Sequence, residues 1–141
     1  MSDLTTLSDD QISNLGNDFE TDLLIVKHVM NWPVVEDSDS SNVGDAAVFA
    51  SIDDLGHEKL ISKVHNPPNR NDGVFRPSGT WSGFGDLYDF LASKGVSIRV
   101  SNTNGHTAVV ENSGTSAEAS ADSASLALSQ AALLLAKRNG I

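Results

Sequence analysis

The stretch "VSIRVSNTNGHTAVVENSGTSAEASA", from Val96 to Ala121, decides the fold class. Apolar and polar residues alternate over 96–100, which is the pattern of a strand with one buried face. An Asn-Gly pair then predicts a tight turn before a second strand that begins at His106. We therefore predict an antiparallel hairpin in the second half of the chain.

The end of this stretch, 115–121, fits two patterns. Thr115 and Glu118 have the spacing of a capping box, which would start a helix at once. Alanines that alternate with polar residues from Ala117 to Ala121 instead fit a third antiparallel strand, with small side chains where a helix packs closely. We favour the strand, and so predict an α+β fold on a small, mainly antiparallel sheet.

A helix is predicted before the hairpin, over "TWSGFGDLYDFLASKG". Trp81 falls on the same arc of this helix as Leu87 and Leu91, so we interpret it mainly as a core anchor. Gly95 supplies the helix stop. Because the "GFG" motif lies inside the helix rather than after a strand, it does not predict a phosphate-binding loop.

The last helix, in "SASLALSQAALLLAKRNG", is apolar on more than one side. Leu126 and Leu133 form a second stripe beside its wide apolar face. Such a helix is either central in the core or part of an oligomer contact. We favour the core, and keep a homo-oligomer through this helix as the alternative.

An amphipathic helix is also predicted over 19–30, with a stop at the Asn-Trp-Pro that follows. His28 lies on its polar side with no second ligand at a suitable spacing, so we interpret it as a surface histidine.

The rest of the first half is polar. Residues 1–17 are predicted to be a frayed lead with at most one helical turn, and 18–141 a single domain with an acidic insertion at about 36–72. Within the insertion, 46–52 resembles a strand, and 52–64 fits either a short helix or a strand pair.

The negative charge is concentrated in the first half. The net charge is −10, and residues 1–60 hold 13 of the 19 acidic residues with two of the nine bases, which gives −11 for that half. No cluster of lysines and arginines is present, so direct nucleic-acid binding is not expected. An acidic surface instead attracts a protein with a basic surface. The candidate acidic face consists of Glu36, Asp37, Asp39, Asp45, Asp53, Asp54 and Glu58.

Catalysis has little support in the sequence. Cysteine is absent, which excludes thiolate sites and fits a reducing compartment. No Gly-x-Ser-x-Gly motif is present, and spacing does not show that His65 or His106 meets Asp72 or Asp86. We therefore predict no catalytic residues, no metal site and no cofactor. No signal peptide or membrane span is expected.

Three blocks of sequence resemble a known family. In the order "LLIVKHVMNW", "FRPSGTWSGFGDLYDFLASKGVSI" and "DSASLALSQAALLLAKR", they are similar to the signature blocks of the phage α-β-α sandwich domain, a family of unknown function common in bacteriophage and prophage genomes. The matching positions are Val29, Met30 and Trp32, then Phe75, Pro77 and Ser78, and finally Asp122, Ser123, Ala124, Leu126 and Ala127.

The chain departs from this family at several places. Asn31 stands where glycine is usual, Ser125 where proline is frequent, and 36–72 is longer and more acidic than in the family. The resemblance implies a helix-sheet-helix sandwich and a phage origin, and it supplies no catalytic residues.

Three functions are compatible with these observations. The first is a phage accessory protein in the host bacterial cytoplasm that docks its acidic face on a host antiviral defence protein, as anti-CRISPR proteins do. The second is a small-ligand binder that sequesters a nucleotide signal, with Arg70, Arg76, Trp81 and His106 as candidate ligand-binding residues. The third is a phage accessory protein of unassigned role.

Overall fold

The computed structural model describes residues 4–31, 34–36, 47–51, 58–62, 76–102 and 105–141. Helices and antiparallel strands follow one another in separate blocks, which confirms the α+β class. The elements in chain order are η1 (Leu4–Thr6), α1 (Asp9–Ser13), α2 (Phe19–Leu24), η2 (Ile25–Met30), β1 (Val34–Glu36), β2 (Ala47–Ser51), β3 (Glu58–Ser62), α3 (Trp81–Ser93), β4 (Ser97–Ser101), β5 (His106–Asn112), β6 (Thr115–Ala121) and α4 (Ala124–Lys137).

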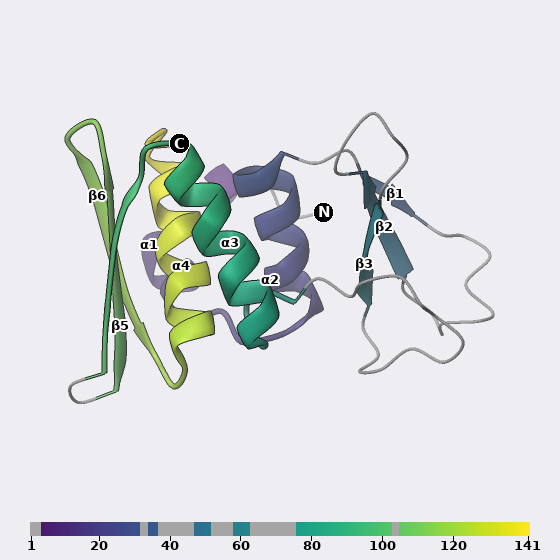
Figure 1. Ribbon diagram of the computed structural model, residues 1–141, viewed down its shortest axis with the longest axis horizontal. Coiled ribbons are helices and arrows are strands. Elements are labelled where there is room, and N and C mark those ends of the chain that lie inside the picture. Colours follow the sequence, from purple (N-terminus) through teal and green to yellow (C-terminus); the bar gives the residue numbers. More distant parts are fainter. Residues whose placement is uncertain (1–3, 32–33, 37–46, 52–57, 63–75, 103–104) are drawn as a thin grey trace.

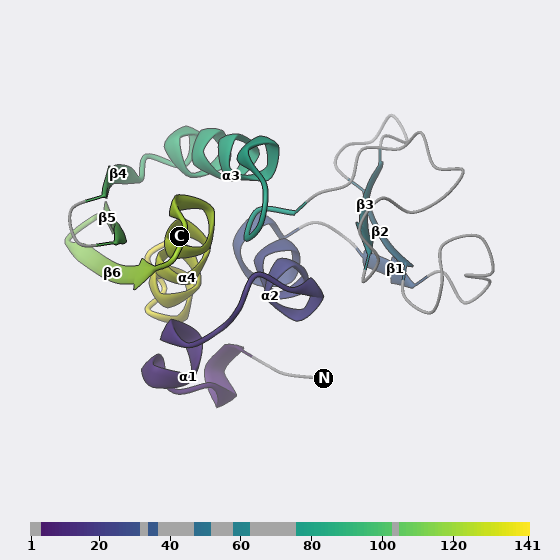
Figure 2. The ribbon, with the colours of Figure 1, turned by 90° about the horizontal axis from the view of Figure 1, so that it is seen from below.

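Helix α4 forms the centre of the core. Between Ala124 and Leu135 every residue except Leu126 is buried. The sheet β4-β5-β6 covers one side of α4, while α3, η2 and α1 lie against the others (Figures 1 and 2). The core interpretation of this helix is therefore confirmed. In its second apolar stripe Leu133 is buried and Leu126 is half-buried, and a homo-oligomer through this helix stays a prediction.

The three strands predicted in the second half are confirmed. They form an antiparallel sheet in which Val110 of β5 lies opposite Ala117 of β6. Ala117 and Ala119 are buried where β6 contacts α4, so the strand interpretation of β6 is confirmed over the capping box. The turn between β5 and β6 has Ser113 and Gly114 at positive φ, as a type I′ turn requires.

The first predicted helix changes its winding part-way. It is α-helical to Leu24, but from Ile25 to Met30 it is a π-helix rather than a continuation of the α-helix. The N–H of Asn31 bonds to the carbonyl of Val26, five residues earlier, which is the π spacing. Apolar periodicity could not reveal this, because both windings place the same residues on the buried side. The stop is as predicted, since Asn31 is left-handed at φ 54°.

The described part of the lead, residues 4–17, is packed against the core, where a frayed segment was predicted. Leu4 and Ile12 are buried in the core cluster, and α1 contacts α4. A capping box between Ser8 and Gln11 starts α1. The side-chain amide of Gln130, on α4, donates a 2.7 Å hydrogen bond to the carbonyl of Leu15.

An ion pair also ties the lead to the end of α4. Asp9 lies 3.0 Å from both Lys137 Nζ and Arg138 Nη2. Hydrogen bonds from Lys137 and Arg138 hold the pKa of Asp9 below its usual value. The polar composition of the lead thus hides two buried apolar residues, Leu4 and Ile12, two half-buried ones, Leu7 and Leu15, and the contacts of Asp9 with Lys137 and Arg138.

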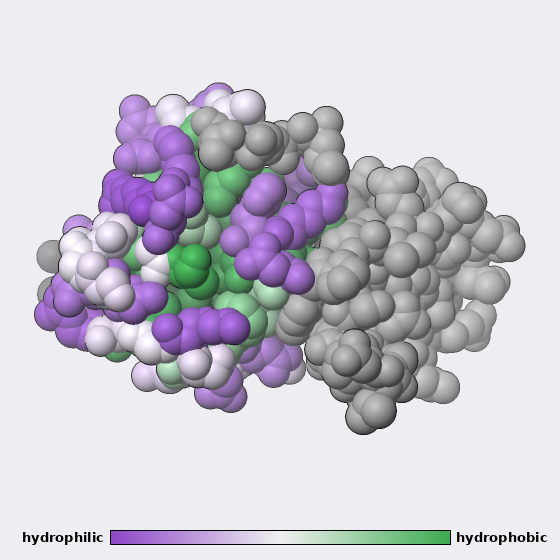
Figure 3. All heavy atoms as spheres, turned by 90° about the horizontal axis from the view of Figure 1, so that it is seen from above, coloured by the Kyte–Doolittle hydropathy of each residue, from purple (hydrophilic) through white to green (hydrophobic). Residues whose placement is uncertain are grey.

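A second antiparallel sheet, in the order β1-β2-β3, lies beyond α2 (Figure 1). It confirms a strand at 46–52 and places a strand, β3, within 52–64. Strand β1 follows the first helix closely and was not predicted. On the face seen in Figure 3, hydrophobic residues of the helical part reach the surface between hydrophilic ones.

Candidate functional site

Helix α3 presents two aromatic residues to solvent. Gly83, Leu87 and Leu91, spaced four residues apart, form the buried ridge of this helix. Trp81 is 74% exposed and Tyr88 is 39% exposed, so the prediction that Trp81 is a core anchor was wrong. The apolar arc of α3 is wider than the part of the helix that the core covers. Gly83 belongs to the buried part but has no side chain, so apolar residues alone do not mark where the buried part lies.

Each of the two exposed rings lies beside Phe84, which is half-buried. The ring of Trp81 meets Phe84 edge-on, with centroids 5.5 Å apart and planes at 76°. Phe84 in turn lies 6.1 Å from Tyr88. We call Trp81, Phe84 and Tyr88 the aromatic ladder. Contacts of this kind hold each ring in place, so the ladder is preorganised rather than loose.

A cleft of about 270 Å³ opens beside the ladder. It lies between the start of α3, the start of α4 and the β4–β5 end of the sheet. Val100 lines it and is 37% exposed, although Val100 lies on the same face of β4 as half-buried Ile98. The cleft is lined by Trp81, Phe84, Val100, Ser101, Asn102, His106 and Ala124.

The cleft brings together two of the four predicted ligand-binding residues, Trp81 and His106. His106 is the first residue of β5 and is half-buried. That Val100 and Asn102 would join them could not be predicted, because they come from β4 and the residues after it rather than from α3. The spacing of the aromatic ladder along α3 was the available signal, and it was read as core.

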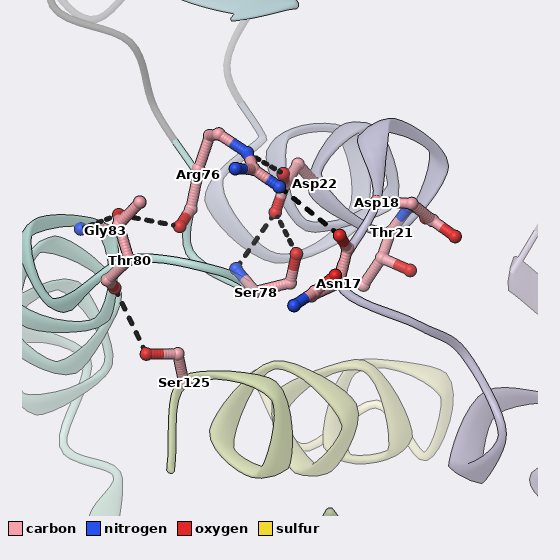
Figure 4. A network of polar contacts seen from close by, with 9 residues as sticks. All are labelled: Asn17, Asp18, Thr21, Asp22, Arg76, Ser78, Thr80, Gly83 and Ser125. Carbon is pink, nitrogen blue, oxygen red and sulfur yellow. Dashed lines mark hydrogen bonds and ion pairs between the residues drawn. The ribbon is translucent and has the colours of Figure 1, made fainter. Parts of the chain in front are cut away.

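Arg76, the third of these candidate residues that is described, does not line the cleft. Its Nε lies 3.7 Å from Asp22 Oδ2, and its Nη2 donates a 3.3 Å hydrogen bond to the carbonyl of Asn17 (Figure 4). Only 12% of the Arg76 side chain is exposed. The guanidinium is therefore held against α2 and not available to a ligand in the cleft.

The turn before α3 is built around Asp22. Asp22 Oδ1 accepts hydrogen bonds from both the N–H and the hydroxyl of buried Ser78. Burial raises the pKa of Asp22 to about 6, although the Ser78 hydrogen bonds and Arg76 act to lower it. Within the Phe-x-Pro-Ser block, Arg76 and Ser78 therefore join α2 to the turn before α3.

The start of α3 is fixed to this turn and to α4. The hydroxyl of Thr80 caps the helix by accepting from the N–H of Gly83, and it donates to the carbonyl of Arg76. Ser125 of α4 donates to the carbonyl of Thr80 at 3.1 Å (Figure 4). These bonds tie Thr80 to α3, to the Arg76 turn and to α4. They therefore set the position of Trp81, which directly follows Thr80.

Two residues of the predicted acidic face lie in described strands. Glu36 ends β1 and Glu58 begins β3. The other predicted residues lie outside the described ones: Asp37, Asp39, Asp45, Asp53, Asp54 and also Arg70, His65 and Asp72. Asn104 of the predicted Asn-Gly turn also lies outside them, whereas Gly105 is described and has a positive φ of 97°.

In the described ranges, no group of three or more histidine, aspartate or glutamate side chains is arranged to hold a metal ion. No helix there is long and apolar enough to cross a membrane. Comparisons with models of protein families, with curated proteins and with solved structures give no significant match. The resemblance to the phage family therefore stays a prediction.

Proposed function

We propose that this chain acts by binding another protein rather than by catalysis, with the cleft and the aromatic ladder at the contact. The observation that carries this proposal is the 74% exposure of Trp81. A large aromatic ring left in water has a strong tendency to be covered, and tryptophan and tyrosine dominate the energy of protein interfaces. The edge-on contact with Phe84 restricts the Trp81 ring, which lowers the entropy cost of binding.

Charge gives a second reason to expect a protein partner. Residues 1–60 carry −11, so a partner with a basic surface would be attracted to that half and its approach accelerated. The acidic residues between Glu36 and Glu58 are the part of this proposal that rests on sequence alone.

The biological role in this proposal is inhibition of a host antiviral defence protein in the bacterial cytoplasm. It rests on the resemblance to a phage family and on the acidic half. Proteins that handle nucleic acid have basic surfaces, and an acidic protein of this kind would compete for them.

Capture from a bacterial lysate tests the proposal. Tagged protein is compared with Trp81→Ala, and with Ser82→Ala as the matched control, because Ser82 is exposed on α3 but does not line the cleft. A basic protein that the parent and Ser82→Ala retain, that Trp81→Ala loses, and that elutes as salt rises would support the proposal. Equal retention by all three proteins would contradict it.

A second candidate is binding of a nucleotide in the cleft. The observation in its favour is that Trp81 and His106 line the same cleft, so a base stacked on the indole would be within reach of an imidazole. Calorimetric titration with a panel of nucleotides tests it. Stacking would change little with salt, whereas docking through the acidic half would weaken steeply.

A further inference from the structure

Strand β4 is the open edge of the sheet. It pairs with β5 on one side and, in the part of the chain that the structure describes, has no strand on the other. Ile98 is half-buried, and its four neighbours in β4 are exposed. At the opposite edge, strand β6, one backbone carbonyl already has a partner, because Arg138 donates a 2.7 Å hydrogen bond to the carbonyl of Ser116. An edge with free N–H and C=O groups is a template for a further strand.

Each face of β4 offers a place for side chains of such a strand. On the inner face, Val100 borders the cleft opposite Trp81 and Phe84. On the outer face, a hollow of about 220 Å³ is lined by Ser97, Arg99, Val109 and Glu111. Since side chains alternate along a strand, an added strand would direct every second residue towards the aromatic rings and the others towards Arg99.

We infer that β4 accepts an extended segment of another protein as an additional strand, with apolar side chains in the cleft and a carboxylate opposite Arg99. This inference rests on the proposed function, since it describes how a protein partner uses the same cleft. The backbone hydrogen bonds of β4 supply affinity, and the aromatic ladder and Arg99 supply specificity.

The charge of Arg99 favours pairing of β4 with a strand of another protein over pairing with β4 of a second copy of this chain. Two β4 strands paired in the antiparallel register that uses all five residues would place Arg99 opposite Arg99, and like charges directly opposite one another are destabilising. A charged residue on an edge strand is a known protection against self-association. A glutamate or aspartate in that position forms an ion pair with Arg99 instead.

The charge of this end of the molecule permits an acidic residue in the segment. From residue 76 onwards five bases balance five acids, unlike the strongly acidic first half. The bases are Arg76, Lys94, Arg99, Lys137 and Arg138, and the acids are Asp86, Asp89, Glu111, Glu118 and Asp122. A partner can therefore place a basic surface on residues 1–60 and a carboxylate beside Arg99.

Two labelled peptides test the inference: fluorescein-Thr-Phe-Glu-Val-Thr, and the same peptide with lysine in place of glutamate. Fluorescence anisotropy measures their binding to the parent and to Arg99→Glu. We expect the parent to prefer the glutamate peptide by roughly two- to five-fold, and Arg99→Glu to reverse that order. Trp81→Ala should weaken both peptides equally. Amide hydrogen exchange of β4 should slow when the peptide binds.

Three outcomes overturn the strand addition: no binding at about 1 mM peptide, an unchanged preference in Arg99→Glu, or unchanged exchange at β4. The proposed function fails on a different result, which is capture from a lysate that does not depend on Trp81. A partner captured through Trp81 that leaves the exchange of β4 unchanged would refute the inference and leave the proposed function standing.

Discussion

Asp22 and Ser78 are 56 residues apart in the sequence, yet Asp22 Oδ1 accepts hydrogen bonds of 2.9 Å and 2.7 Å from the N–H and the hydroxyl of Ser78. This contact spans the segment that holds β1 to β3 and joins the two ends of the helical part around it. It also holds the turn from which α3, and with it Trp81, begins.

Asp22→Asn should change how stability depends on pH. The pKa of Asp22 is raised to about 6 in the folded protein, so the folded state binds a proton that the unfolded chain has released. The parent therefore loses about 2 kcal/mol of stability from this group as pH rises from about 4.5 to 8. An asparagine keeps the acceptor for Ser78 and does not titrate, so the variant should not show that loss.

Urea unfolding at several pH values measures this difference. Asp89→Asn is the matched control, because Asp89 is exposed on α3. If Asp22→Asn and Asp89→Asn follow the parent with the same pH dependence, the burial of a carboxylate with a raised pKa is wrong.

Gly83→Ala should destabilise the fold, while Gly85→Ala should not. A Cβ at Gly83 would overlap the carbonyl group of Arg76, which is backbone and has little freedom to move. Overpacking of this kind costs about 1–3 kcal/mol. A Cβ at Gly85 meets nothing within 4 Å, so alanine there should stabilise α3 by about 0.5–1 kcal/mol. Thermal unfolding of both variants measures the contrast, and equal effects would contradict the contact between α3 and the Arg76 turn.

Ile12→Ala should lower the free energy of unfolding by about 2–5 kcal/mol, because Ile12 is fully buried against the core. Asp10→Asn, at an exposed position of the same helix, should change it by less than about 0.5 kcal/mol. Denaturant unfolding compares the two. A loss for Ile12→Ala as small as that for Asp10→Asn would mean that the lead is not part of the core.

Ala119→Leu should destabilise the protein by about 1–3 kcal/mol, since Ala119 is buried where β6 lies against α4. Ser116→Val is the control on the exposed face of the same strand, and should be neutral or slightly stabilising. The opposite order of effects would indicate that β6 presents its other face to the core.

Much of the second half could be predicted from sequence because local signals agreed there. Alternation marked β4 and β6, and two residues of types that tolerate a positive φ, Asn31 and Gly95, marked helix ends. Polarity misled in the lead, where Leu4 and Ile12 are buried in the core and Leu7 and Leu15 pack against it. The composition of the segment is mostly polar, so it does not reveal the few apolar residues that pack against the core.

The cleft could not be predicted, because its residues come from four elements whose separation depends on packing. Trp81 shows the difficulty most clearly. The sequence predicts on which side of α3 Trp81 lies. Whether that side faces the core or the solvent depends on how α3 packs against α4. Gly83, whose lack of a side chain permits the close approach to the Arg76 turn, decides that orientation.

The central claim is that a partner protein covers Trp81. Its most direct test is the ¹⁹F spectrum of this chain labelled with 5-fluorotryptophan, in which the Trp81 resonance is assigned by its absence in Trp81→Phe. We expect a solvent-exposed resonance for the protein alone, and a shifted or broadened one once the captured protein fraction is added. A Trp81 resonance that stays unchanged when the partner is bound would contradict the claim.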